Sequence, residues 1–454
     1  MVKIPELLAP AGSRKNMRFA FAYGADAVYA GQPRYSLRVR NNEFSKHEVI
    51  ADAIAEAHAL GKKFYLASNI NPHNAKIKTY LRDLEPVIDM NPDALIMSDP
   101  GLIMMVRDRW PDMPVHLSVQ ANAVNYASVE FWRRMGLSRV ILSRELSLEE
   151  IAEIKANVPE MELEVFVHGA LCIAYSGRCL LSGYMSHRDP NQGTCTNTCR
   201  WKYDVHQTDT DDSGDLVKVA AANAEATTQA NAALWSPGNA ANDLDEVAPV
   251  LLEEETRPGE LMPAYEDEHG TYIMNSKDLR AVQHVEALTK MGMDSLKIEG
   301  RTKTYFYVAR TTQAYRKAID DAVAGRPFDM RLMDELESLA NRGYTEGFYR
   351  RHLPEEYQNY EKGASTPTRQ QYVGDISAHT DTSITIAVKN KFCVGDTVEL
   401  MTPAGNHRFT VDAMTNAKGE SITDAKGSGH VVTIPIHVEA QVDDFSLLLR
   451  DLPK

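Results

Sequence analysis

Short apolar runs alternate with amphipathic segments along most of the first 325 residues. We predict β-strands at Glu6–Leu8, Ala27–Ala30, Phe64–Ala67, Ala94–Met97, His116–Val119, Val140–Leu142, Leu163–Val167 and Ser295–Ile298. Apolar positions with helical spacing occur at 46–60, 100–109, 126–135, 147–157 and about 304–322. Alternating strands and helices form right-handed βαβ units and a parallel sheet. Eight units predict a TIM-like (β/α)8 barrel. An open doubly wound sheet is the main alternative, but no G-x-G-x-x-G motif follows the first strand.

Serine residues stand where three of the helices should begin. Ser13 precedes the first helix, Ser45 precedes the second, and Ser147 stands just ahead of Glu149 and Glu150. A serine side chain at this position accepts a hydrogen bond from a backbone N–H that the first helical turn leaves free. We therefore predict that these three serines cap their helices.

The stretch between the seventh and eighth strands is too long for one barrel helix and its loops. We interpret about 185–270 as an insertion into a barrel domain that spans residues 1–325. Within it, residues 207–256 are rich in Asp, Glu, Ala, Asn and Thr and show little apolar periodicity, which predicts a mobile acidic loop. Order should return near TYIMNSKDL (271–279), as a strand end that leads into a helix.

The pattern changes again after residue 325. Residues 326–371 form a polar connector with a helical pattern over 330–343. In residues 372–454, the alternating runs SITIAV, DTVELM, HRFTVDAM and HVVTIPI are separated by turns that contain Gly, Asn and Asp. The predicted fold class is therefore α/β: a TIM-like barrel with an insertion after strand seven, followed by a small antiparallel β-barrel that serves as an accessory binding domain.

Composition and charge narrow the function. The 454 residues are 43% hydrophobic and 25% charged, and no apolar run approaches the roughly 18 residues of a membrane helix. The N-terminus lacks the basic and apolar regions of a signal peptide, so we expect a cytoplasmic protein with reduced thiols and no membrane partner. A net charge of −14 argues against broad, nonspecific nucleic-acid binding, although it leaves room for a local basic site.

Four of the five cysteines lie in one short stretch. Cys172, Cys179, Cys195 and Cys199 are spaced Cys-x6-Cys-x15-Cys-x3-Cys, and only Cys393 lies elsewhere. Reduced thiols make disulfides the weaker interpretation and a metal centre the stronger one. Zinc sites usually use closer pairs, so the irregular spacing favours a 4Fe–4S cluster over zinc. Because Cys172 and Cys179 follow strand seven, the centre should lie at the barrel mouth. Cys393, in a predicted strand, is interpreted as a buried apolar residue.

A (β/α)8 barrel builds its active site at the carboxyl ends of its strands, and polar residues collect there. They are Ser68, Asn69, Asn71, Ser98, Asp99, Gln120, Asn122, Ser143, Arg144, Glu145, His168, Lys297, Glu299 and Arg301. About half of these should be caps or turn formers. Arg144, His168 and Arg301 are stronger candidates, because a cation is costly to bury unless it binds an anion. This pattern favours an acidic small molecule or a phosphate as ligand.

The residues around the first cysteines resemble a known family. In EVFVHGALCIAYSGRCLLS (164–182), nine positions match the signature of peptidase family U32, the collagenase-like peptidases: Glu164, Phe166, Gly169, Ala170, Leu171, Cys172, Gly177, Cys179 and Ser182. ELLAPAGS…GADAVYAG and SLKIEGRTK also resemble that family, so the resemblance covers nearly the whole chain. GTCTNTCRWKY and RPGELMPAYEDEHGTYIMNSKDLR are most similar to its branch that acts in tRNA hydroxylation.

This resemblance implies a function that spacing could not give. Members of that branch take part in forming 5-hydroxyuridine at the wobble position of tRNA, without molecular oxygen and with prephenate as a co-substrate. Related members carry a 4Fe–4S cluster, for which Cys172 and Cys179 occupy the signature positions and Cys195 and Cys199 match the downstream pair. Whether the protein transfers the hydroxyl itself or needs a protein partner stays open.

Roles for individual residues follow from this expected chemistry. Prephenate is a dicarboxylate, so arginines are its expected partners, and a side chain at the mouth must move protons at the uridine. The candidate substrate-binding residues are Arg38, Asn69, Gln120, Arg144 and Arg301, and the candidate catalytic residues are His168 and Glu299.

Two other functions compete with RNA modification. One is a peptidase in the literal sense of the family name, although the chain has no H-E-x-x-H or G-x-S-x-G motif. The other is a nonenzymatic RNA-binding scaffold in which zinc only pins the insertion to the barrel.

Overall fold

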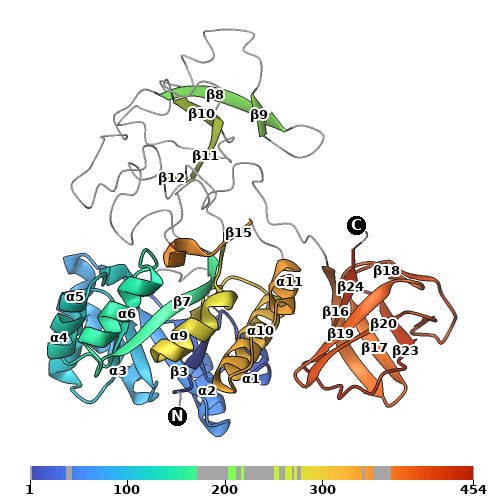
Figure 1. Cartoon of the computed structure of the whole chain (residues 1–454), viewed down its shortest axis with the longest axis horizontal. Coiled ribbons are helices and arrows are strands. Elements are labelled where there is room, and N and C mark those ends of the chain that lie inside the picture. Colours follow the sequence, from blue (N-terminus) through green and yellow to red (C-terminus); the bar gives the residue numbers. More distant parts are fainter. Residues whose placement is uncertain are drawn as a thin grey trace.

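Eight parallel strands close into a barrel in the computed structural model of the chain (Figure 1). They are β1 (Glu6–Pro10), β2 (Ala27–Gly31), β3 (Lys63–Ser68), β4 (Ala94–Met97), β5 (Val115–Leu117), β6 (Arg139–Ile141), β7 (Glu162–Ala170) and β14 (Ser295–Ile298). Strand β14 closes the barrel because it pairs in parallel with both β1 and β7. The TIM-like prediction is confirmed, and each of the eight predicted strands is present.

The structure describes most of the chain. The described residues are 3–36, 43–170, 203–210, 216–218, 250–254, 261–267, 270–272, 278–339, 343–350 and 370–452. In this part of the chain, no helix is long and apolar enough to cross a membrane.

Helices cover the outside of the barrel. They are α1 (Arg14–Ala22), α2 (His47–Ala59), α3 (Asn74–Asp89), α4 (Pro100–Arg109), α5 (Tyr126–Arg134), α6 (Leu148–Asn157), α9 (Val285–Met291) and α10 (Tyr305–Val323). Ser13 and Ser147 cap α1 and α6 as predicted, and Ser147 forms a capping box with Glu150. The prediction for Ser45 is wrong: α2 begins one residue later, with Lys46 at its N-cap and no capping side chain.

The insertion contains an antiparallel sheet. Its strands are β8 (Tyr203–Thr210), β9 (Leu216–Lys218), β10 (Val250–Glu254), β11 (Leu261–Asp267) and β12 (Gly270–Tyr272). The mobile loop predicted over 207–256 is therefore wrong at these strands, because short runs such as VLLEE pair through their backbones despite the acidic composition around them. Residues 211–215, 219–249 and 255–256 of the predicted loop lie outside the described residues.

The chain rejoins the barrel through β13 (Asp278–Arg280), which pairs antiparallel to β7 and parallel to β15 (Tyr344–Thr345). The helix predicted over 330–343 is shorter, because α11 ends at Glu337 (Arg331–Glu337). Among the described residues, short 3₁₀ helices also occur after β5 as η1 (Val119–Ala121), before α9 as η4 (Val282–His284) and after β15 as η5 (Gly347–Arg350).

Residues 370–451 form a second unit, the C-terminal β-domain. Its strands are β16 (Gln370–Thr380), β17 (Ser383–Val388), β18 (Phe392–Cys393), β19 (Thr397–Thr402), β20 (Gly405–Thr410), β21 (Thr415–Asn416), β22 (Asp424–Ala425), β23 (Val431–Pro435) and β24 (Leu447–Asp451). Seven of them form one antiparallel sheet, and β18 pairs with β22. They surround an apolar core that is separate from that of the barrel. Cys393 is half-buried, so its assignment to the core is wrong: β18 has only two residues, and Phe392 takes the inward position.

The C-terminal β-domain packs against α1 and α10 of the barrel. Phe19 on α1 contacts Tyr305 and Phe445, with ring centroids 5.0 and 5.3 Å away. Tyr23 donates its hydroxyl to the carbonyl oxygens of Met401 and Phe445 at 3.2 and 2.9 Å. An apolar seam with directional hydrogen bonds fixes the orientation of the domain as well as its position.

A fully buried arginine lies in the same seam. Arg310 on α10 donates to Glu399 on β19, and Gln370 donates to the second carboxylate oxygen of Glu399 at 3.1 Å. Burial alone would raise the pKa of Glu399, but Arg310 outweighs it and holds that pKa below its ordinary value. The carboxylate therefore stabilises the fold above the unfolded pKa of glutamate and loses this effect as the pH falls through its folded pKa.

Removing one partner of the Arg310–Glu399 pair should lower the free energy of unfolding more than replacing both partners with apolar residues. We expect Arg310→Met or Glu399→Leu to lower the free energy of unfolding by about 3 to 5 kcal/mol each, because each leaves a buried charge without its partner. The double variant should recover much of that loss. Urea unfolding of the three variants measures this coupling, and additive losses in the double variant would contradict it.

Candidate active site at the mouth of the barrel

A carboxylate and an arginine meet where the strands end. Glu299 directly follows β14, and Arg144 lies in the loop after β6. Their side chains are only 12% and 9% exposed, and the Arg144 Nη2 to Glu299 Oε2 distance is 3.8 Å. Tyr29 on β2 donates its hydroxyl to Glu299 Oε2 at 3.1 Å. Three separate strands thus hold one carboxylate at the mouth.

Aromatic rings pack against the cations near Glu299. The Arg144 guanidinium lies 3.8 Å from the centroid of Phe166 on β7, and Lys297 Nζ lies 4.3 Å from that of Tyr29. The negative face of an aromatic ring attracts one side of a cation, and the other side of the cation can still bind an anion. The geometry therefore suits a site in which cations are positioned before an anion arrives.

Below the mouth, four charged side chains alternate in sign along the barrel interior. Lys297 donates to Glu164 at 2.9 Å, Arg139 donates to Glu164 at 3.1 Å, and Arg139 also donates to Glu6 at 2.6 Å. We call these residues the interior charge column. Burial lowers the pKa of Lys297, against the opposing effect of Glu164, whereas Arg139 and the Tyr65 hydroxyl hold the pKa of Glu6 below its ordinary value despite its burial.

Arg301 is held close to the backbone. Its Nη1 donates to Ser36 Oγ at 3.1 Å, and its Nε is buried with no hydrogen-bond partner among the described residues. A Cβ on Gly12 would lie 1.8 Å from the Arg301 carbonyl oxygen, and one on Gly31 would lie 3.0 Å from Nη1. Only glycine therefore fits at position 12, and the backbone of Arg301 lies against that glycine.

Asn69 and Gln120 form another polar pair. Asn69 Nδ2 donates to Gln120 Oε1 at 2.9 Å, and Ser98 donates to the Asn69 carbonyl at 2.9 Å. They follow β3 and β5, which lie across the barrel from β14 in the strand order. Asp99, one of the other predicted mouth residues, is a structural cap: its side chain accepts from the backbone N–H of Leu102.

His168 is placed differently from the sequence expectation. Its contacts come from α10 and β15, outside the barrel wall: Nδ1 lies 3.3 Å from the Tyr315 hydroxyl, and its ring lies 5.5 Å from that of Tyr344. Glu164 and Phe166 face inward, but the register between β7 and β14 shifts before His168 and turns this side chain away. Its Nε2 is buried, and no residue that the structure describes forms a hydrogen bond with it.

Arg38 and the four cysteines Cys172, Cys179, Cys195 and Cys199 lie outside the described residues, so their predicted roles stay predictions. Strand β7 ends at Ala170, two residues before Cys172 in the sequence. Among the described residues, no group of three His, Cys, Asp or Glu side chains could hold a metal.

The sequence-based prediction did not include Tyr29, Phe166 or Glu164 among the site residues. An aromatic residue in an apolar strand gives no signal of a site, because it is typical of a core. Glu164 did give a signal in the sequence, because a carboxylate within the buried run EVFV needs a charged or hydrogen-bonding partner.

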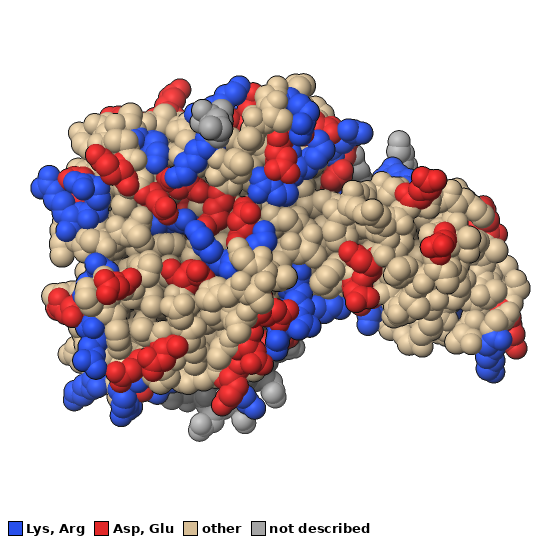
Figure 2. Space-filling model, turned by 90° about the horizontal axis from the view of Figure 1, so that it is seen from below, with Lys and Arg blue, Asp and Glu red and all other residues tan. Residues whose placement is uncertain are grey.

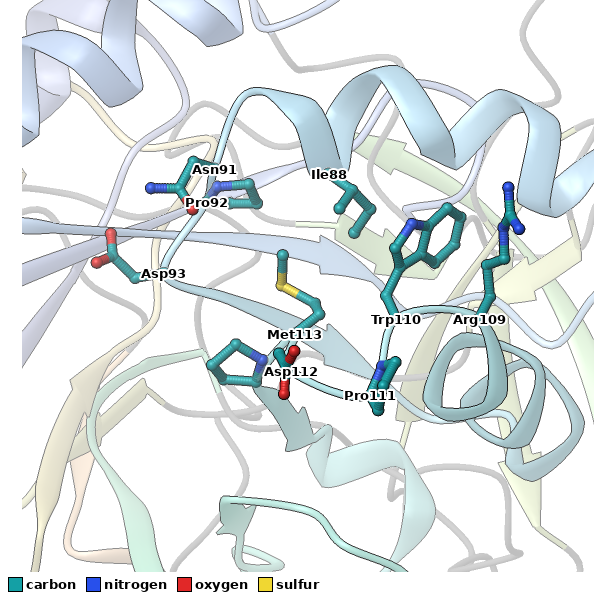
Figure 3. A pocket seen from close by; sticks show the side chains of 10 residues that line it. Ile88, Asn91, Pro92, Asp93, Arg109, Trp110, Pro111, Asp112 and Met113 are labelled. Carbon is teal, nitrogen blue, oxygen red and sulfur yellow. The ribbon is translucent and has the colours of Figure 1, made fainter.

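A surface pocket lies on the opposite side of the barrel, at the loops before β4 and β5 (Figure 3). Figure 3 shows Ile88, Trp110 and Met113 facing one another across it. The carboxylate of Asp93, at one end, accepts from the backbone N–H of Phe64 at 2.7 Å. Active sites of this fold lie at the other face, so we do not assign this pocket to the site.

Burial makes His168 a source of acid sensitivity. It lowers the pKa of His168 from 6.5 to about 3, with Arg280 and Lys303 adding to the effect. Between these values the unfolded chain binds a proton that the folded chain does not, so stability falls as the pH falls. We expect His168→Phe to flatten the dependence of unfolding free energy on pH in this window. The exposed His379 provides a matched control, and an unchanged slope in His168→Phe would contradict the assignment.

Comparisons with known proteins match nearly the whole chain to one protein family. The model of peptidase family U32 matches residues 12–359, and the model of the family's C-terminal domain matches residues 368–449. The chain is 62% identical to "tRNA hydroxylation protein P" of Escherichia coli, over 98% of this chain and 97% of that protein. It is 60% identical to the protein of the same name from Haemophilus influenzae, over 99% and 96%.

A more distant relative acts on a different RNA. The "23S rRNA 5-hydroxycytidine C2501 synthase" of Escherichia coli is 28% identical, over 82% of this chain and 46% of that protein. The two family matches and the two near-full-length relatives, at 60% identity or more, show that the chain belongs to peptidase family U32.

Proposed function

We propose that this protein hydroxylates tRNA and forms 5-hydroxyuridine at the wobble position. The observation that carries this proposal is the 62% identity, over nearly the full length of both chains, to a protein named for tRNA hydroxylation. The name of the rRNA relative, a 5-hydroxycytidine synthase, adds a second pyrimidine hydroxylated at C5. Replacing C5–H by C5–OH adds one oxygen atom and removes two electrons, so the reaction needs an oxygen donor and an electron acceptor.

Prephenate is the proposed co-substrate, and the mouth offers partners for its two carboxylates. Arg144 and Arg301 carry planar guanidinium groups that can bind carboxylates through two parallel hydrogen bonds. Arg144 is already aligned by Phe166, and Arg301 by Ser36. Such preorganisation reduces the entropy that ordering the side chains would otherwise cost on binding.

Glu299 is the proposed group that moves a proton at the base. Its Oε2 accepts from Tyr29 and lies beside Arg144. A carboxylate held at the mouth by two partners is positioned to accept a proton from a base that enters there. We do not propose this role for His168, because its side chain contacts α10 and β15 outside the barrel wall.

The proposed cofactor is a 4Fe–4S cluster held by Cys172, Cys179, Cys195 and Cys199. Four thiolates are a donor set that fits such a cluster, and Cys172 follows the carboxyl end of β7 by two residues in the sequence. When bound, the cluster supplies one-electron chemistry. The protein's part is to hold the base, the co-substrate and the proton acceptor around it.

A genetic test separates this function from its alternatives. In cells that lack this gene and any oxygen-dependent enzyme for the same modification, the wild-type gene should restore 5-hydroxyuridine in tRNA, measured by nucleoside mass spectrometry. Cys172→Ala/Cys179→Ala should fail to restore it, and Arg133→Ala, on the exposed face of α5, should succeed. Unrestored 5-hydroxyuridine with a soluble wild-type protein would refute the proposal.

Anaerobic purification tests the cofactor. The wild-type protein should be brown and contain iron and acid-labile sulfide, and the double cysteine variant should lose both. A colourless protein with stoichiometric zinc would instead favour the scaffold alternative.

Arg144 can be tested through steady-state kinetics. Arg144→Met should raise the KM for prephenate by about tenfold or more, because it removes a charged hydrogen-bond donor. Arg144→Lys should recover only part of the loss, since it restores the charge but not the planar fork. An unchanged KM in Arg144→Met would place prephenate elsewhere.

A further inference from the structure

One end of the C-terminal β-domain gathers exposed basic side chains. Lys389, Lys391, Lys418, Lys426 and His430 are exposed. Within the part of the chain that the structure describes, none of the four lysines forms a salt bridge, although the net charge of the chain is −14. We call these five residues the lysine cluster. The face opposite the mouth, by contrast, mixes Lys and Arg with Asp and Glu (Figure 2).

The loops that carry the cluster are packed together. Ser428 Oγ donates to the carbonyl of Lys389 at 3.1 Å, and Val388 donates its backbone N–H to the carbonyl of His430 at 2.9 Å. A Cβ on Gly427 would be 3.8 Å from the Lys389 carbonyl oxygen. The backbone positions of these cations are therefore fixed by the fold.

The register of the sheet adds the remaining lysine. Asn416 on β21 pairs with Val432 on β23, so the turn that contains Lys418 lies at the same end as His430. Three carboxylates lie near the cluster. Asp396 accepts from the backbone N–H of Cys393 at 2.8 Å and lies 3.7 Å from Arg450, Glu420 accepts from Asn416 at 2.7 Å, and Asp424 lies on β22. The four lysines outnumber these carboxylates at this end of the domain.

The cluster is held at a fixed position relative to the barrel mouth. Asn390, between two cluster lysines, donates to the carbonyl of Tyr372 at 2.8 Å. Tyr372 stacks on Phe306, with ring centroids 5.3 Å apart, and its hydroxyl lies 2.9 Å from that of Tyr305. Both partners belong to the first turn of α10, which begins just after β14 on the mouth side. In Figure 1, β18 lies at the end of the domain that faces the same side as the mouth.

We propose that the lysine cluster binds the sugar–phosphate backbone of the RNA whose base enters the barrel mouth. This inference rests on the proposed function for its substrate. Flexible, strongly hydrated ammonium groups on packed loops suit phosphates, which carry no sequence information but position the nucleic acid. A membrane would require an apolar patch, whereas the neighbouring exposed apolar residue is a lone Val431.

The role differs from that of the mouth. Cations at the mouth bind a small anion and decide the chemistry, whereas the lysine cluster supplies affinity for a polyanion. Because the seam around Arg310 fixes the orientation of the domain, the distance between the lysine cluster and the barrel mouth is also fixed. This distance should select RNAs of matching shape. A substrate must present a phosphate backbone at one site and an accessible base at the other.

The test compares two triple variants of the full-length, cofactor-loaded protein. Lys389→Ala/Lys391→Ala/Lys426→Ala removes three cluster charges, and Lys62→Ala/Lys290→Ala/Lys317→Ala removes three charges elsewhere. Binding to unmodified tRNA is measured as a function of salt concentration. The cluster variant should bind more weakly and reduce the slope of log K against log salt by about 2 to 3, since each of the three lost phosphate contacts removes about 0.7 to 0.9 units. The control triple should keep the wild-type slope.

Three other outcomes would change the conclusion about the lysine cluster or about the proposed function. An unchanged slope in the cluster variant, with unaltered thermal unfolding, would overturn the proposal. Intact tRNA binding combined with lost binding to vesicles of anionic lipid would also overturn it and assign the cluster to a membrane. If the cluster variant loses tRNA binding but the wild-type gene restores no 5-hydroxyuridine in cells, the cluster stands as an RNA site and only the proposed function fails.

Discussion

The interior charge column is the constraint on which the barrel depends. Four ionised side chains lie where this fold usually packs aliphatic layers, and each is buried at a cost of several kcal/mol unless it meets an opposite charge. Glu6, Arg139, Glu164 and Lys297 satisfy one another only when β1, β6, β7 and β14 are in register around the closed barrel. Closure and charge pairing therefore require each other.

This arrangement links the centre of the barrel to its mouth. Lys297 faces Glu164 on one side and the ring of Tyr29 on the other, and Tyr29 holds Glu299. A side chain at the mouth is thus oriented by contacts that begin deep in the core. Rigid support of this kind is what a site needs when its groups must be in place before the substrate binds.

Much of the fold could be predicted from the sequence, because buried parallel strands are short apolar runs and the helices between them are amphipathic. The site could be predicted only in part. Arg144 and Glu299 were found from their positions after strands, and the structure brings them together. His168 occupied an equivalent position in the sequence, but a register shift, which leaves no trace in apolar periodicity, turned it behind the wall. The strands of the insertion were hidden by acidic neighbours, since pairing through the backbone does not need an apolar face.

The seam between the barrel and the C-terminal β-domain has a consequence for protein engineering. Phe19, Tyr23 and Arg310 belong to the barrel in sequence, but they complete a surface of the β-domain. A chimera that exchanges only residues after 370 would pair foreign strands with these side chains and leave an arginine without its carboxylate. Fragments that fold and recombine as units should carry the outer faces of α1 and α10 together with the β-domain. The boundary visible along the chain is thus a poor place at which to cut it.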